Sequence, residues 1–135
     1  MRVVLDTNVV VSAALTGHGA CARILDMLCA GASELYADDR ILGEYDSVLH
    51  RPELRIDPGN VEIVLELLRH VATPVAAAPR PVELPDPDDL PFLEVAATAN
   101  AILVTGNTRH FPKRACTGTT VVSPKEFLDL LRQLA

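Results

Sequence analysis

Short runs of Val, Ile and Leu alternate along this chain with longer stretches that carry apolar residues at helical spacing. We predict strands near 2–5, 34–37, 73–76, 102–105 and 119–122. Helices are predicted near 19–30, 39–50, 59–72, 91–100 and 124–134, after a helical run at 9–15. Strands that alternate with helices are typical of βαβ units and a mainly parallel sheet. The sequence therefore predicts the α/β fold class, with residues 1–135 in a single domain.

Two of the predicted strands run directly into polar residues. Asp6-Thr7-Asn8 ends the first strand, and Thr105-Gly106-Asn107 ends the fourth. Ligands of an open parallel sheet bind at the carboxyl ends of its strands, so Asp6 and Asn107 share a crevice if these strands are neighbours. Capping of the next helix by Asp6 is the ordinary alternative, and it is favoured when this motif is taken alone.

Glu44 lies at the margin of the apolar stripe on the predicted helix 39–50. Its side chain is therefore expected to point along the boundary of the core. The alternative is a surface ion pair with Arg40, four residues earlier, which would contribute only about 0.3 kcal/mol. The residue alone does not separate these two interpretations.

Six prolines set the segment 73–91 apart from the rest of the chain. Proline fixes φ and removes a backbone donor, so we predict a stiff, extended connection without helix. This connection leads into Asp86-Pro87-Asp88-Asp89. One acid satisfies a helix N-terminus, whereas three repel one another unless a cation or a donor lies among them. The cluster therefore favours a functional role.

The charge pattern limits the kinds of surface that the protein presents. A net charge of −6 argues against a broad nucleic-acid-binding face, although a small site still reaches phosphates through metal ions. The compact basic patch at 109–114 is expected to leave the same end of the sheet as Asn107 and to hold phosphates, or else to be a solvated loop. His110, within this patch, has no partner in the sequence and is expected to be structural or superficial.

The cysteines and the apolar runs bear on the location of the protein. Three cysteines without C-x-x-C spacing predict reduced thiols in a cytoplasmic protein and no zinc site. The apolar runs are too short for a membrane span, and the first predicted strand leaves no room for a secretory signal.

Acidic and amide residues that converge from several elements are suitable ligands for a hard cation such as Mg²⁺ or Mn²⁺. In this order and placement, the motifs resemble the PIN domain family of metal-dependent ribonucleases, and within it the toxins of bacterial toxin–antitoxin pairs. The resemblance covers residues 5–125. It rests on Leu-Asp-Thr-Asn-Val at 5–9, Glu44, Asp-Pro-Asp-Asp-Leu-Pro-Phe-Leu-Glu at 86–94, Leu-Val-Thr-Gly-Asn at 103–107 and Ser-Pro-Lys-Glu-Phe at 123–127.

The resemblance implies a sheet of order 3-2-1-4-5 and an acidic pocket that holds one or two Mg²⁺ or Mn²⁺ ions. It implies that Asp6, Glu44 and Asp89 are catalytic. The implied metal ligands are Asp6, Glu44, Asp86, Asp89 and Asn107, and the expected substrate contacts are Asn8, Thr105, Arg109, Lys113 and Arg114. Asn107 stands where the family usually has an acid, so weaker metal binding is expected.

RNA is the implied substrate, an antitoxin is a possible protein partner, and a homodimer is expected. Reasoning from the elements alone puts the start of the helix near Asp89 at the far sheet edge, unless the proline-rich segment carries it back. The resemblance implies that Asp89 does reach the crevice.

Three other functions remain open at this point. A receiver-type signalling domain needs an acidic pair after the first strand and an acceptor Asp after the third, where this chain has Ala76-Ala77-Ala78. A phosphatase needs Asp-x-Asp, where this chain has Asp6-Thr7-Asn8. A PIN-like binding module whose catalysis is impaired by Asn107 differs from the enzyme only in lacking metal-dependent RNA cleavage.

Overall fold

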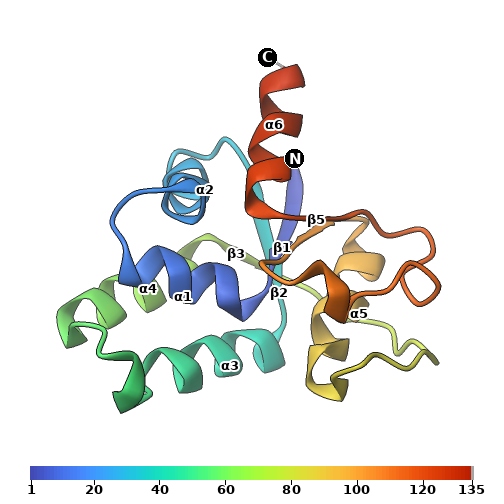
Figure 1. The fold of residues 1–135 in the computed structure, drawn as a ribbon, viewed down its shortest axis with the longest axis horizontal. Helices are drawn as coiled ribbons and strands as arrows, with labels where there is room; N and C mark the ends of the chain where they lie inside the picture. Colours follow the sequence, from blue (N-terminus) through green and yellow to red (C-terminus); the bar gives the residue numbers. More distant parts are fainter. Residues whose placement is uncertain (135) are drawn as a thin grey trace.

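The computed structural model of the protein describes residues 1–134 (Figure 1). Among these residues, five parallel strands form one sheet in the order β3-β2-β1-β4-β5. The strands are β1 (Arg2–Leu5), β2 (Glu34–Ala37), β3 (Ala72–Pro74), β4 (Ile102–Val104) and β5 (Val121–Val122). Both the α/β class and the order 3-2-1-4-5 are confirmed, although β3, β4 and β5 are shorter than predicted.

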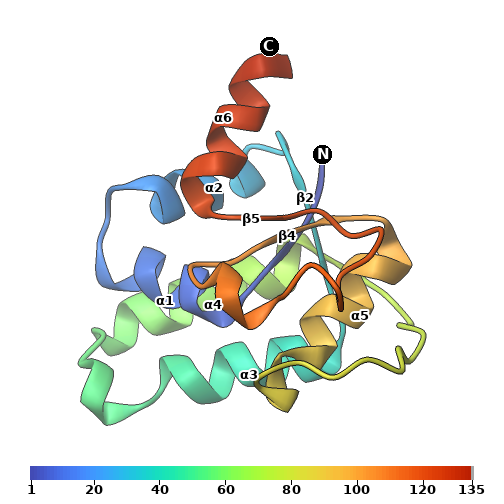
Figure 2. The ribbon, with the colours of Figure 1, turned by 45° about the vertical axis from the view of Figure 1, so that its right-hand side comes forward.

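The helices alternate with these strands, as the sequence pattern predicts. They are α1 (Thr7–Leu15), α2 (Ala20–Cys29), α3 (Asp39–Leu49), α4 (Pro58–Val71), α5 (Leu90–Ala99) and α6 (Pro124–Leu134). Helix α6 extends away from the body of the molecule, close to the N-terminus, in both views (Figures 1 and 2). No helix within residues 1–134 is both long enough and apolar enough to cross a membrane.

The proline-rich segment departs from the prediction at its end. Pro87–Asp89 forms a short 3₁₀ turn, and α5 begins at Leu90 instead of 91. The carboxylate of Asp86 accepts a hydrogen bond of 3.0 Å from the backbone N–H of Asp88, which caps this turn. The prediction of a segment free of helix up to residue 91 is therefore wrong at 87–90, because Asp86 supplies a cap and proline is tolerated in the first turn.

The central strand β1 is buried on both faces, as expected for a sheet covered by helices on both sides. Val3, Val4 and Leu5 are each fully buried. Parallel pairing sets Leu5 opposite Val104, so the residues that follow β1 and β4 emerge side by side. The backbone N–H of Asp6 donates to the Val104 carbonyl at 2.9 Å and continues the ladder beyond the end of β1.

Tyr45 ties α3 to the end of β1. Its side chain is fully buried, its ring centroid lies 6.5 Å from that of Phe92, and its hydroxyl donates to the Leu5 carbonyl. Burial, with smaller contributions from Asp6 and Glu44, raises the pKa of Tyr45 well above its usual value, so the hydroxyl remains a donor. This bond fixes the backbone immediately before Asp6.

We expect Tyr45→Phe to lower the free energy of unfolding by about 1–3 kcal/mol, because it leaves the buried Leu5 carbonyl without this donor. Tyr36→Phe is the matched control, since the Tyr36 hydroxyl contacts Glu34 at the surface. The control should change stability by less than about 0.5 kcal/mol. Chemical denaturation of both variants measures the difference, and equal effects would show that the buried bond adds nothing.

Candidate active site

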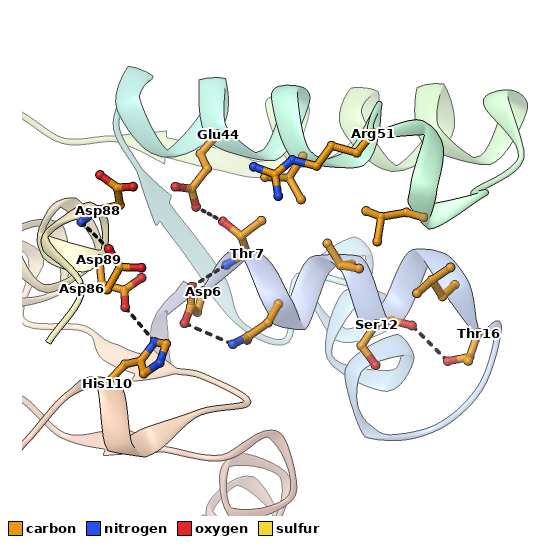
Figure 3. Close-up of a pocket in the computed structure, with 15 residues that line it drawn as sticks. Asp6, Thr7, Ser12, Thr16, Glu44, Arg51, Asp86, Asp88, Asp89 and His110 are labelled. Atoms are coloured by element: carbon orange, nitrogen blue, oxygen red, sulfur yellow. Dashed lines mark hydrogen bonds and ion pairs between the residues drawn. The ribbon is translucent and has the colours of Figure 1, made fainter.

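A cleft with a volume of about 550 Å³ opens at the carboxyl end of β1 (Figure 3). One end of the cleft is acidic, and its far end is formed by α1, α3 and the turn that follows α3. The acidic end carries Asp6, Glu44, Asp86, Asp88, Asp89 and His110, and the far end carries Val11, Leu15, Val48, Arg51 and Leu54. The structure therefore brings together acids that the sequence places on three separate elements.

Asp6 is both a helix cap and a wall of the cleft, so the two interpretations of this residue do not exclude each other. One carboxylate oxygen accepts from the Thr7 N–H at 2.8 Å, which caps α1. The other oxygen accepts from the Thr105 hydroxyl at 2.7 Å and from the Asn8 side-chain amide at 3.4 Å. These donors hold the carboxylate in one orientation toward the cleft.

Thr105 and Asn8 position the acidic end of the cleft. Thr105 is fully buried, and its hydroxyl donates to Asp6 and so orients that carboxylate. The Asn8 side-chain oxygen accepts from the Gly106 N–H at 2.9 Å. A Cβ at residue 106 would lie 3.3 Å from that oxygen, so glycine permits this close approach.

Glu44 faces the cleft and not the surface. Its carboxylate accepts a hydrogen bond from the Thr7 hydroxyl, which joins α3 to the start of α1. The alternative of a surface pair with Arg40 is wrong, because the Arg40 guanidinium binds Asp38 and Glu94 at 2.7 Å each.

Glu94 anchors the proline-rich segment that carries Asp86. One oxygen of this buried carboxylate binds Arg40, and the other accepts from the Arg80 N–H at 2.9 Å. The segment is thereby fixed to α3 and α5 before it enters the 3₁₀ turn. The three acidic side chains at 86–89 are consequently delivered to the cleft.

Asp89 lies at the same sheet edge as Asp6, and the reasoning that placed it at the opposite edge is wrong. A helix that leads into a parallel strand runs back along the sheet, so its N-terminus lies at the carboxyl ends of the strands. The Asp89 carboxylate contacts His110 Nδ1 at 3.0 Å. One ligand atom each from Asp86, Asp89 and His110 lie within 4.8 Å of one another.

His110 is the cleft residue that sequence reasoning undervalued. It ends the 3₁₀ turn Thr108–His110 after β4, and its side chain is 41% exposed toward the cleft. Its partner Asp89 is distant in sequence, so no local pattern reveals the contact. The position of His110 in the loop that follows β4, at the same sheet edge as Asp6, is the feature of the sequence that indicates a place in the cleft.

Burial and, to a lesser degree, mutual repulsion alter the ionisation of the acids in the cleft. Burial is the main cause that raises the pKa of Asp6 and of Glu44, and it is opposed by hydrogen bonds from Thr105 and Thr7 respectively. Burial, followed by the charges of Asp6 and Asp86, raises the pKa of Asp89 to about 6, while His110 opposes this shift. A cation in the cleft would relieve this repulsion, so the donor set fits a metal ion.

Asn107 and the basic residues at 109–114 follow β4. The Asn107 backbone N–H donates at 3.0 Å to the Thr105 hydroxyl oxygen, and that hydroxyl in turn donates to Asp6. Arg109 and Lys113 line a second cavity of about 490 Å³, together with Cys116 and Val121. Arg114 is exposed. The basic patch is therefore divided between a neighbouring cavity and the surface, while His110 faces the cleft.

Comparison with known proteins gives three results. A family model described as "PIN domain" matches residues 2–109. The chain is 29% identical over 141 residues to the uncharacterized protein MJ1680 of Methanocaldococcus jannaschii, across 96% of this chain and 90% of that protein. The solved structure of VapBC2 from Rickettsia felis, bound to a DNA fragment from their promoter, matches with a TM-score of 0.62 and 16% identity, over 91% of this chain and 98% of that chain. The last similarity is one of fold.

We expect Asp89→Asn to stabilise the metal-free protein at pH 7 by on the order of 1–3 kcal/mol. The Asp89 carboxylate makes no capping bond to α5, so the substitution removes charge without removing a cap. Because its folded pKa is raised, the wild-type contribution of Asp89 to stability is greatest below about pH 4 and is lost as the pH rises through about 6.

Denaturation of the two proteins between pH 4 and pH 7, in chelator, measures this contribution. The variant should lose less stability than the wild type across that range. Identical pH profiles would contradict the assignment of the raised pKa to Asp89.

Proposed function

The chain belongs to the PIN domain family, and we propose that it is a metal-dependent endoribonuclease that hydrolyses RNA phosphodiester bonds. The convergence of five carboxylates at the carboxyl end of β1 is the observation that carries this proposal. The pKa values of Asp6, Glu44 and Asp89, raised mainly by burial and further by neighbouring carboxylates, support it, because perturbed acids gathered in one cleft are typical of functional sites.

In this proposal Asp6, Glu44 and Asp89 are the catalytic acids. The residues that would hold Mg²⁺ or Mn²⁺ are Asp6, Glu44, Asp86, Asp89 and Asn107. Bound there, the ion would supply an acidified water and neutralise charge on the phosphate. Asn107 stays a proposed ligand, and its neutral amide would bind a cation more weakly than a carboxylate.

The side chains of the cleft would prepare the reaction by orientation. Thr105 and the Thr7 N–H hold Asp6, and the Thr7 hydroxyl holds Glu44. Each acid therefore keeps its position before substrate arrives, which is how electrostatic stabilisation avoids reorganisation during the reaction. The Asn8 side chain lines the cleft and is proposed to contact RNA while it clamps the loop at Gly106.

We further propose that the protein is the toxin of a toxin–antitoxin pair, acts in the cytoplasm, and forms a homodimer. The similarity in fold to VapBC2, a toxin–antitoxin complex, supports this assignment. The rival function is a PIN-like RNA- or protein-binding module without catalysis, which the asparagine at residue 107 favours. Cleavage of RNA separates the two.

Purified protein should cleave RNA in Mg²⁺ or Mn²⁺ and should stop in excess chelator. Loss of a group that only supports a metal ligand typically lowers activity by roughly 10- to 100-fold. Asp6 is itself a proposed ligand, so Asp6→Asn should lower the cleavage rate by more than that. The fold should survive, because asparagine is also a good N-cap.

Asp39→Asn is the matched control, since Asp39 is an exposed acid in the first turn of α3 and outside the cleft. It should cleave at the wild-type rate. Undiminished cleavage by the Asp6 variant, or by wild-type protein in chelator once contaminating nuclease is excluded, would contradict the mechanism.

The basic patch is proposed to hold the RNA backbone through Arg109, Lys113 and Arg114. Replacing all three with Ala should weaken RNA binding. Each phosphate contact on a single strand contributes roughly 0.7 to the slope of log affinity against log salt, so the loss of all three contacts should reduce the slope by about 2. Binding titrations at several salt concentrations measure this slope. An unchanged slope would identify the patch as a solvated loop.

A further inference from the structure

His110 stands apart from the other groups at the acidic end of the cleft because it offers nitrogen. It comes from the turn after β4, whereas Asp86 and Asp89 come from the 3₁₀ turn that precedes α5. Its Nδ1 lies 3.0 Å from Asp89, and the three side chains present ligand atoms within 4.8 Å of one another. Two elements far apart in sequence thus build a mixed nitrogen and oxygen donor set (Figure 3).

We propose that His110 is a direct nitrogen ligand of the ion held beside Asp86 and Asp89, and that it makes this position select Mn²⁺ over Mg²⁺. The inference rests on the proposed metal site. It does not require that RNA be the substrate.

The spacing of the donors agrees with direct ligation. Two neighbouring ligands at about 2.1 Å from an octahedral ion lie about 3 Å apart. The separation of His110 Nδ1 from the Asp89 oxygen is 3.0 Å. The turn that carries His110 is itself fixed, since the His110 N–H donates to the Asn107 carbonyl at 3.2 Å. Little movement is then needed for both atoms to reach one ion.

The chemistry of the donors sets the preference among ions. Mg²⁺ favours oxygen ligands and retains water. Mn²⁺ also suits a site of carboxylates, but as a softer, transition-metal ion it accepts an imidazole nitrogen more readily than Mg²⁺ does. A single imidazole among acids therefore raises affinity for Mn²⁺ more than for Mg²⁺.

A different role for His110 predicts a different result. If the imidazole only pairs with Asp89, it competes with any cation for that carboxylate. Its removal would then strengthen binding of Mg²⁺ and Mn²⁺ alike, or leave both unchanged. The ratio of the two affinities therefore separates ligation from simple charge pairing.

The test is calorimetric titration of the whole protein with Mn²⁺ and with Mg²⁺, without RNA. We expect His110→Gln to weaken Mn²⁺ binding by about 10-fold or more, with Mg²⁺ affinity changed much less. His50→Gln is the control, because His50 also contacts two carboxylates, at 3.0 Å and 3.3 Å, but outside the cleft. The control should keep the wild-type ratio.

A second readout examines the wild-type protein directly. Pulsed electron paramagnetic resonance of bound Mn²⁺ should detect coupling to nitrogen, and His110→Gln should remove it. An unchanged affinity ratio in His110→Gln, absence of nitrogen coupling, or failure of the wild type to bind Mn²⁺ would each overturn the assignment. Nitrogen coupling without RNA cleavage would uphold His110 as a ligand and refute the proposed substrate alone.

Discussion

The parallel pairing of β1 with β4 brings Asp6 and Thr105 together, and the acidic cleft depends on this junction. Leu5 lies opposite Val104, and the Asp6 N–H extends the ladder by one more bond. The Thr105 hydroxyl then reaches the Asp6 carboxylate from the neighbouring strand. Tyr45 secures the same point from α3 by binding the Leu5 carbonyl. A shift in register between these strands would displace the acid and its donors at once.

The other acids reach this junction because buried polar contacts direct the loops and helices that carry them. Glu94 binds Arg40 and the Arg80 backbone, so the proline-rich segment is held against α3 and α5. Gathering the carboxylates in a partly buried cleft disfavours their charged forms: burial first, and mutual repulsion second, raise the pKa values of Asp6, Glu44 and Asp89. A site that is unfavourable without a cation and well oriented for one is what metal-dependent hydrolysis requires.

Local pattern was sufficient to predict much of the fold. The strand runs were visible in the sequence. Helix α6 also begins where it was predicted, and reciprocal bonds between Ser123 and Glu126 at 3.0 Å and 3.1 Å cap it. The position of Asp6 at the carboxyl end of one predicted strand, beside the end of another, also identified it as a candidate site residue. The strand order 3-2-1-4-5 came from family resemblance, because short apolar runs do not specify their neighbours.

Tertiary contacts account for what the sequence could not reveal. Glu44 was ambiguous because its partner Thr7 lies on another helix, and His110 appeared isolated because Asp89 precedes it by a whole helix and strand. The basic patch is predicted to act as one surface, but the loop turns so that Lys113 lines a second cavity while His110 lines the first. Loop paths of this kind follow from long-range packing and have no periodic signature.

The central claim is that the acids at the end of β1 form a metal-binding site. Anomalous diffraction from crystals grown with Mn²⁺ would locate the ion directly. The account predicts an anomalous peak within coordination distance of the Asp6 and Asp89 carboxylates, with His110 among its neighbours. Crystals with Mn²⁺ bound elsewhere at high occupancy, and no peak in this cleft, would contradict the account.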